Sequence, residues 1–363
     1  MSGDLAARLA QRALALCRIP SPIGQEAAIA DWVEAWAKER YAPQEILRKS
    51  HSFVLGNLQD PRPAVLLVGH LDTVPPHPTD APPRIEGDRL HGLGASDMKG
   101  GVAVMLALAE DLPRSALPVN LLLLLYEREE GPYLESGLGP LFEAAPMLSK
   151  AKLGIALEPT DGAIQVGCVG SLHVTLRFKG KSAHSARPWQ GENAIHRAGP
   201  LLAELLEKPR REVQIDGFPF FEVFSITKAS GGRARNVIPD ELELNLNYRF
   251  APGKSVAQAR DDVRALIGGR AEVEVTDEAP SGRVCTDNPL LAHLRSTSGF
   301  RAEAKQAWTD VARLSAMGVD AVNLGPGETA QAHQARESAG IPAMAVVYEA
   351  LAEFLRTAPA RRE

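Results

Sequence analysis

The stretch LLVGHLDTVPP, residues 66–76, decides the fold. It begins as an apolar strand and ends in two titratable side chains, His70 and Asp72. Burying a charge beside a sheet core is costly unless the charge is paired or bound to a metal. Because residues two apart in a strand point the same way, we expect His70 and Asp72 to share one side. The stretch therefore predicts a buried strand with a functional site at its carboxyl end.

Two other apolar runs have the same form, VNLLLLLY (119–126) and LGIALE (153–158). Together with AVLLVG (64–69), they suit strands of a parallel sheet that is covered on both faces. The segment KGGVAVMLALAEDL (99–112) fits a helix between the first two strands. This β–α–β order predicts an open α/β sheet. The pattern also predicts helices at 4–18, 25–40 and 310–317, and a strand at 321–325.

The pattern changes near residue 170 and then changes back. SLHVTLRFKG (171–180), ELELNLNYRF (241–250) and AEVEVT (271–276) alternate apolar and polar residues, as strands with one wet face do. Helical patterns at 193–208 and 255–269 separate them. We therefore expect a smaller α+β domain with an exposed sheet face, inserted into the first domain.

The expected boundaries follow from these two patterns. Residues 1–169 and 285–363 are expected to form one discontinuous catalytic domain. Residues 170–284 are expected to form the inserted domain, and no internal repeat appears.

Composition excludes several classes of protein. The 363 residues carry a formal net charge of −5, and no basic stripe suggests a nucleic-acid partner. Three cysteines without a CxxC pair argue against a disulfide framework or a cysteine zinc site, and they fit the cytoplasm. The most apolar run, 121–126, is too short to cross a bilayer. The N-terminus lacks the apolar core of a signal peptide, so we expect no membrane association.

Ligand-type side chains follow each of the three central strands. Because carboxyl ends of parallel strands meet at one edge, we expect these groups to converge. Adjacent Glu129 and Glu130 should point oppositely, so that one binds metal while the other acts as a general base. Nitrogen and oxygen donors without thiolate suit Zn²⁺, with Co²⁺ or Mn²⁺ as substitutes. The candidates are His70, Asp72, Asp97, Glu129, Glu130, Glu158 and His333.

Each candidate also has an ordinary structural explanation. A lone histidine at a strand end is more often structural, and Glu129–Glu130 could be a solvated strand end. Asp97 alone could cap a helix, and Glu158 before a proline could be a turn residue. Taken together, these structural explanations require a separate reason at every strand end, whereas one metal site explains all of the residues at once. A nicotinamide enzyme is excluded because no G-x-G-x-x-G fingerprint is present.

Five motifs carry a resemblance to a known family. HLDTVP, GLGASDMKGG, EREEG, ALEP and GPG…AHQARE resemble the co-catalytic zinc peptidase/deacylase family in order and spacing over nearly the whole chain. AWTDVARLSAMGVDAVNLGPG (307–327) is most similar to the family's desuccinylases. The resemblance implies a zinc-peptidase-like α/β catalytic domain with a central, mostly parallel sheet. It also implies an inserted ferredoxin-like α+β dimerisation domain, hence a homodimer.

The resemblance also implies a role for each residue. His70 and Glu158 would hold one of two Zn²⁺ per subunit, Glu130 and His333 the other, and Asp97 would bridge them. Asp72 would orient His70, and Glu129 would be the general base on a metal-bridging water. His184 would stabilise the oxyanion in the partner subunit. The implied substrate contacts are Asn236, Arg249, Thr309 and Gly327.

The implied reaction is hydrolysis of a small N-acyl amino acid. The expected substrate is N-succinyl-LL-2,6-diaminopimelate, which gives succinate and LL-2,6-diaminopimelate. The alternatives are N-acetylornithine deacetylation, another deacylase or carboxypeptidase of the family, and a non-catalytic metal- or amino-acid-binding protein. Many desuccinylases carry an arginine pair where this chain has Cys168 and Val169. One carboxylate-binding arginine is therefore expected to be either missing or supplied elsewhere, with Arg233 and Arg235 as the candidates.

Overall fold

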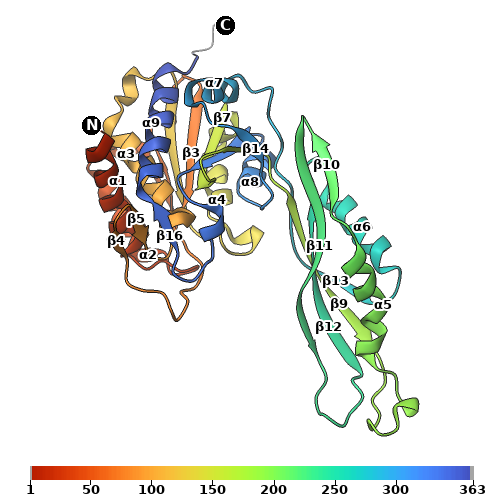
Figure 1. Cartoon of the computed structure of the whole chain (residues 1–363). Helices are drawn as coiled ribbons and strands as arrows, with labels where there is room; N and C mark the ends of the chain where they lie inside the picture. Colours follow the sequence, from red (N-terminus) through yellow and green to blue (C-terminus); the bar gives the residue numbers. More distant parts are fainter. Residues whose placement is uncertain (1, 360–363) are drawn as a thin grey trace. The chain divides into compact units, whose positions relative to one another are not determined.

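The computed structural model describes residues 2–359, which form two compact units (Figure 1). Unit 1 comprises the chain up to Gly167, the segment Gly282–Lys305 and the chain from Thr309 onward. Unit 2 comprises Cys168–Ser281 and the short segment Gln306–Trp308. No helix of the described residues is long and apolar enough to span a membrane.

Unit 1 is built on an eight-stranded sheet in the order β1-β2-β6-β3-β7-β15-β8-β14. The four central strands β6, β3, β7 and β15 are parallel, whereas β2 is antiparallel to β6 and β8 is antiparallel to β15. The expected mostly parallel sheet is therefore confirmed at its centre, with antiparallel additions on both sides. The strands are β1 (Ile46–Lys49), β2 (Ser52–Leu55), β3 (Ala64–His70), β6 (Asn120–Tyr126), β7 (Leu153–Pro159), β8 (Ile164–Val166), β14 (Ala302–Ala304) and β15 (Ala321–Gly325).

Helices cover the central strands because these strands are apolar along most of their length. The strands β6 and β7 are buried at every position. Helices α1, α3 and α9 pack against one another, and α8 packs on β7 and β15. The helices are α1 (Ser2–Cys17), α2 (Ala27–Lys38), α3 (Gly100–Asp111), α4 (Leu138–Ala144), α7 (Pro289–Ser298), α8 (Val311–Ala316) and α9 (Ile341–Thr357). A small antiparallel sheet, β16-β5-β4, joins Ser338–Gly340 to Arg89–His91 and Arg84–Glu86.

Helix α3 approaches β7 closely because it begins with two glycines. A Cβ atom on Gly101 would lie 2.3 Å from the main-chain oxygen of Leu157, closer than any side chain tolerates. The helix is apolar on nearly all sides, as a helix buried between a sheet and other helices must be. This contact fixes the start of α3, and with it the preceding loop that carries Asp97.

Unit 2 is a five-stranded antiparallel sheet in the order β10-β11-β12-β9-β13. The strands are β9 (Gly170–Lys179), β10 (Arg211–Ile215), β11 (Phe218–Gly231), β12 (Glu241–Phe250) and β13 (Glu272–Ala279). Alternate apolar residues of β9 and β12 pack with α5 (Ala194–Glu207) and α6 (Val256–Ile267). The polar residues face the other way, and ion pairs such as Arg177–Glu274 (2.5 Å) cross the strands there.

A pair of matched substitutions tests the close contact between α3 and β7. We expect Gly101→Ala to lower the free energy of unfolding by about 2 kcal/mol or more, because the new methyl group meets backbone that cannot rotate away. Gly139→Ala in α4 is the control, since a Cβ there meets nothing within 4 Å. The control should leave stability unchanged or raise it by up to about 1 kcal/mol. Equal urea midpoints for both variants would contradict the contact.

Candidate metal centre

His70 is the last residue of β3 and is completely buried. Its Nε2 lies 3.1 Å from Oδ1 of Asp97, and its Nδ1 lies 3.0 Å from the main-chain oxygen of Asp72. Burial opposes protonation of the imidazole, but the hydrogen bonds to Asp72 and Asp97 outweigh it and raise the pKa of His70 well above its usual value. The ring therefore sits among anionic oxygens that favour a positive charge.

The carboxylate of Asp97 lies between two histidines. Its Oδ1 faces Nε2 of His70 at 3.1 Å, and its Oδ2 lies 3.6 Å from Nε2 of His333. His333 is also 2.9 Å from Oε2 of Glu130. Three groups of donor atoms lie within 4.8 Å of one another, and they are His70–Asp97–Glu158, Asp97–Glu130–His333 and His70–Glu129–Glu130. Asp97 belongs to the first two groups, and a carboxylate within reach of two donor groups fits a pair of metal ions.

Asp72 holds the loop that carries the two adjacent glutamates. Its Oδ1 accepts the backbone N–H of Glu129 and its Oδ2 that of Glu130, both at 3.0 Å. The carboxylate also approaches His70, with 3.5 Å between Oδ1 and Nδ1. The side chain therefore joins the end of β3 to the loop after β6. The sequence predicted the contact with His70 but not the two backbone hydrogen bonds.

The site concentrates negative charge in a buried place. Burial, together with the neighbouring Asp97 carboxylate, raises the pKa of Glu158 to about 8. Burial, with Asp310 and Glu158 nearby, raises the pKa of Glu129 well above its usual value. Such carboxyl groups are costly to ionise unless cations accompany them. The donor set, two imidazoles and several carboxylates without thiolate, therefore fits divalent ions such as Zn²⁺.

Glu337 supports Asp97 and was not assigned a role from the sequence. Its carboxylate accepts three backbone N–H groups from the loop before α3, those of Gly94 (2.8 Å), Ser96 (2.6 Å) and Asp97 (2.9 Å). Burial raises the pKa of Glu337 to about 7. The only signal in the sequence is that a glutamate follows His333 by four positions within AHQARE.

Asp310 is a second residue whose role the sequence did not reveal. It is fully buried and accepts hydrogen bonds from the Tyr126 hydroxyl and from Nε of Arg313. Tyr126 is the last residue of β6, so Asp310 ties the segment before α8 to the strand that precedes Glu129. The neighbouring Thr309, a predicted substrate contact, is 4% exposed.

The other predicted substrate contacts are placed as follows. Gly327 is buried, and its carbonyl accepts the N–H groups of Thr160 (3.0 Å) and Asp161 (3.1 Å). A Cβ on Gly327 would lie 2.4 Å from the Ser96 oxygen, so packing alone requires glycine there. The remaining two, Asn236 and Arg249, lie in unit 2, as does His184, the predicted oxyanion donor.

Within unit 2, the loops of His184 and Asn236 lie side by side. The Ser185 N–H donates to the main-chain oxygen of Asn236 at 2.9 Å. Arg249 lies on β12, where its Nε donates to Oδ1 of Asn247 at 3.0 Å. Arg233 donates to the Ser182 hydroxyl at 3.3 Å, and Arg235 is exposed.

The chain is similar to several known proteins. The family model described as peptidase family M20/M25/M40 matches residues 66–357. A protein of Mycobacterium tuberculosis named putative succinyl-diaminopimelate desuccinylase is 40% identical over 343 residues, covering 94% of this chain and 96% of the relative. A succinyl-diaminopimelate desuccinylase of Corynebacterium glutamicum is 35% identical over 351 residues, covering 94% of each chain.

A solved structure shares the fold. The Bacillus subtilis YXEP protein, titled a dinuclear metal-binding peptidase from the M20 family, superposes with a TM-score of 0.68 at 18% identity. The match covers 97% of this chain and 98% of that one.

The pKa of His333 predicts how the stability of the metal-free protein depends on pH. The hydrogen bond with Glu130 raises this pKa from 6.5 to about 9. The imidazolium pair therefore stabilises the fold fully below about pH 6.5, and this stability is lost as the pH rises through about 9. Because His333 is 56% exposed, we expect a loss of only about 1 kcal/mol.

Urea unfolding of chelator-treated protein between pH 6 and 9.5 measures this loss. His333→Gln is the comparison, because it removes the titrating group and keeps a polar side chain. The variant should show a smaller decline over this range than the parent protein. Parallel curves would show that the His333–Glu130 pair does not carry the pH dependence.

Proposed function

The chain belongs to peptidase family M20/M25/M40, and from that premise we propose that it hydrolyses N-succinyl-LL-2,6-diaminopimelate. Water cleaves the amide bond and gives succinate and LL-2,6-diaminopimelate. The observation that carries the proposal is Asp97, whose two oxygens face the two histidines of two donor groups. The choice of substrate rests on relatives of 35–40% identity that cover 94% of this chain and are named for that activity.

We propose that the centre holds two Zn²⁺ ions, with Co²⁺ or Mn²⁺ as possible substitutes. His70 and Glu158 would hold one ion, Glu130 and His333 would hold the other, and Asp97 would serve both. The groups His70–Asp97–Glu158 and Asp97–Glu130–His333 support this division because they share only Asp97. A third group, His70–Glu129–Glu130, places the proposed base beside a ligand of each ion. When bound, such ions polarise the amide carbonyl and lower the pKa of water.

Glu129 is the proposed general base. Its carboxylate takes a proton from the attacking water and gives it to the nitrogen of the leaving amine. The position of Glu129 supports this role, because one of its oxygens lies within 4.8 Å of donor atoms of His70 and of Glu130, one proposed ligand of each ion. Asp72 accepts a hydrogen bond from the backbone N–H of Glu129, and this bond helps to hold the proposed base in position.

His184 is the proposed hydrogen-bond donor to the oxyanion. Its Nδ1 accepts the backbone N–H of Ala186 at 3.1 Å, so the neutral ring carries its proton on Nε2. The side chain is exposed and can present this N–H to a substrate. In the proposed homodimer, the partner subunit's His184 serves the site of this subunit.

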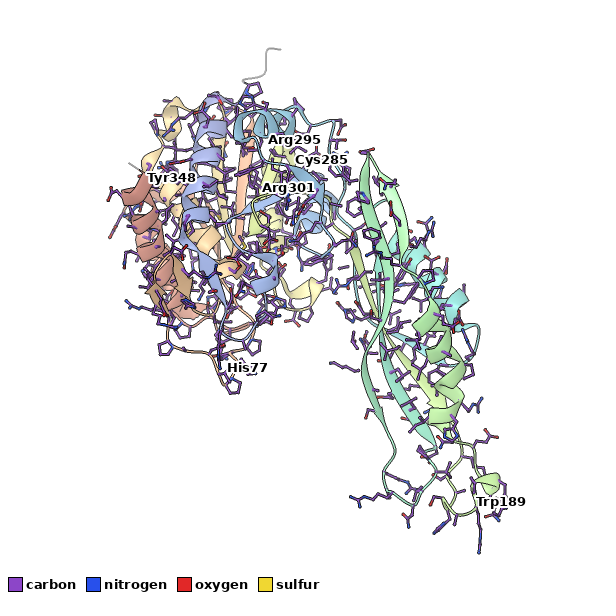
Figure 2. All side chains as sticks on the ribbon, viewed as in Figure 1. His77, Trp189, Cys285, Arg295, Arg301 and Tyr348 are labelled. Atoms are coloured by element: carbon purple, nitrogen blue, oxygen red, sulfur yellow. The ribbon has the colours of Figure 1, made fainter. Side chains whose placement is uncertain are left out.

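Exposed apolar residues of unit 2 support the dimer. Ile195, Leu202 and Leu206 recur at helical spacing on α5 and are 42%, 38% and 87% exposed. Trp189, in the loop before α5, is 77% exposed (Figure 2). An uncovered apolar stripe of this kind is typical of an interaction surface. We accordingly assign residues 1–169 and 285–363 to catalysis, and 170–284 to dimerisation.

Asn236, Arg249, Thr309 and Gly327 are the proposed substrate contacts. Burial lowers the pKa of Arg249, and the guanidinium has no carboxylate within 4.0 Å among residues 2–359. A carboxylate of the substrate would supply the missing counter-charge. Arg233 and Arg235 are the other cations that could bind a carboxylate of the substrate. The substrate and a second subunit are the only partners proposed. The three cysteines are free and buried, which fits a reducing compartment, and we propose that the protein is cytoplasmic.

The direct test is succinate release by the purified protein. We expect turnover of N-succinyl-LL-2,6-diaminopimelate that is lost after chelation and restored by Zn²⁺, with little action on N-acetylornithine. Liberated amine and succinate are measured together, because hydrolysis releases one of each. If only N-acetylornithine is hydrolysed, the assigned substrate is wrong and N-acetylornithine takes its place. If neither compound is hydrolysed while metal is bound, the proposal is contradicted.

Mixed dimers test the roles of Glu129 and His184 together. Glu129→Gln and His184→Ala should each lower kcat about 100-fold or more while metal content is unchanged. Mixing the two variants and allowing subunits to exchange should restore activity, because one site of each mixed dimer then has both groups. Recovery to about one quarter of the parent activity is expected from random pairing. Absence of recovery after proven exchange would place His184 in the site of its own subunit.

A further inference from the structure

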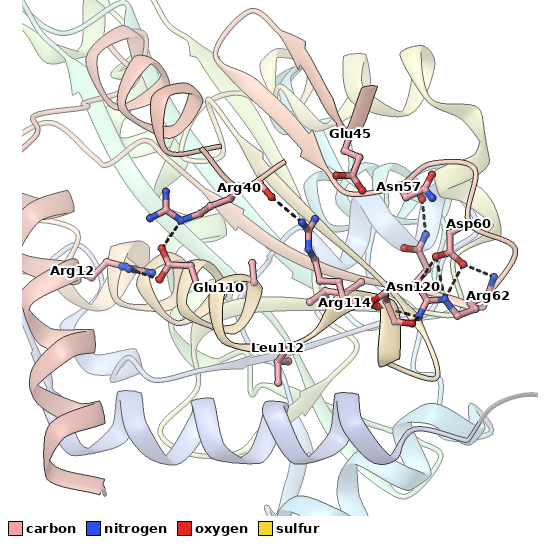
Figure 3. Close-up of a pocket in the computed structure, with 13 residues that line it drawn as sticks. Arg12, Arg40, Glu45, Asn57, Asp60, Arg62, Glu110, Leu112, Arg114 and Asn120 are labelled. Atoms are coloured by element: carbon pink, nitrogen blue, oxygen red, sulfur yellow. Dashed lines mark hydrogen bonds and ion pairs between the residues drawn. The ribbon is translucent and has the colours of Figure 1, made fainter. Parts of the chain in front are cut away.

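A cavity of about 780 Å³ lies in unit 1 at the amino ends of β3 and β6 (Figure 3). The candidate metal ligands follow the carboxyl ends of these parallel strands. At about 3.3 Å per residue, seven residues separate the two places by about 20 Å. The cavity is therefore distinct from the metal centre. Its charged lining residues are Arg12, Arg40, Glu45, Asp60, Arg62, Glu110 and Arg114.

Most of these charges neutralise one another. Glu110 pairs with Arg12 at 2.6 Å and with Arg40 at 2.8 Å, and Arg40 also pairs with Glu39 at 2.7 Å. Asp60 accepts hydrogen bonds from Arg62, at 2.9 Å from Nε to Oδ1. These pairs shape the wall of the cavity and have little remaining charge to offer a ligand.

Arg114 and Glu45 have no such partner. Within residues 2–359, no carboxylate lies within 4.0 Å of the Arg114 guanidinium and no cation lies within 4.0 Å of the Glu45 carboxylate. Arg114 is held in place, since it stacks 3.9 Å above the Tyr41 ring and donates from Nη2 to the main-chain oxygen of Arg40. Glu45 is also held, because its Oε2 accepts the N–H of Ala42 at 3.1 Å.

We infer that this cavity binds a free α-amino acid as a zwitterion. The carboxylate of the ligand pairs with the fixed guanidinium of Arg114, and its ammonium group pairs with Glu45. One cation and one anion, neither with an oppositely charged protein partner within 4.0 Å among residues 2–359, match a ligand that carries one charge of each sign. Because contacts already hold both side chains, little side-chain freedom is lost on binding.

The rest of the lining suits the side chain of such a ligand. Ala109, Leu112 and Leu121 provide apolar surface, and Asn57 and Asn120 provide amides. The volume lies within the usual range of small-molecule sites, about 300–1,000 Å³. This site is independent of the proposed catalytic function, because none of its residues belongs to the metal centre.

Calorimetric titration of the full chain tests the inference. The probes are L-alanine and L-lysine, with acetate and inorganic phosphate as ligands that carry only negative charge. We expect saturable binding of the amino acids with about one site per chain. Arg114→Gln and Glu45→Gln should each weaken this binding about tenfold or more. Arg264→Gln is the control, because Arg264 is an exposed residue of unit 2, and it should change nothing.

The double variant Arg114→Glu with Glu45→Arg provides the sharper test. Exchanging the two charges should restore amino-acid binding, because a zwitterion can bind in the reverse direction. The inference is overturned if neither amino acid binds, or if both single variants bind as tightly as the parent. It is also overturned if phosphate binds and only Arg114→Gln abolishes binding, since the site then takes anions.

Discussion

The position of Asp97 between two histidines depends on one buried carboxylate, that of Glu337. Three backbone N–H groups of the Gly94–Asp97 loop donate to it from a segment about 240 residues away in the chain. On the other side of the loop, Gly101 lets α3 lie against the main chain of β7. Asp97 is thus fixed from two directions. Only with its position fixed can its two oxygens face His70 and His333 at the same time.

The central part of the fold could be read from the sequence because burial on both faces leaves a clear signal. The apolar runs at 64–69, 119–126 and 153–158 are β3, β6 and β7. The antiparallel hairpin β1-β2 and the strands β10 and β11 of unit 2 were not predicted. The strands β1 and β2 have only four residues each, which is too short to show a clear period. The strands β10 and β11 are exposed or half-buried at nearly every position, so they lack the apolar alternation of a strand with one buried face. The pairing of β11 with β12 even shifts register between Ile226 and Lys228, which disturbs the alternation.

The sequence predicted those residues of the candidate site that lie at or just after the ends of strands. The carboxyl ends of parallel strands meet at one edge, so the ligand-type residues after β3, β6 and β7 were expected together, and the structure brings them together. The sequence did not predict the hydrogen bonds that hold these residues in place. Glu337 and Asp310 act through hydrogen bonds to segments distant in the chain, and no local spacing encodes such contacts. The same holds for Arg114 and Glu45, whose common feature is that neither has an oppositely charged partner within 4.0 Å among residues 2–359.

The most direct test of the account is anomalous diffraction from crystals grown with Zn²⁺, recorded above and below the zinc edge. We predict two peaks per chain about 3.5–4 Å apart, both in contact with the carboxylate of Asp97. One peak should lie against His70 and Glu158 and the other against Glu130 and His333. A single peak at full zinc occupancy, or two peaks of which only one touches Asp97, would contradict the shared-carboxylate centre.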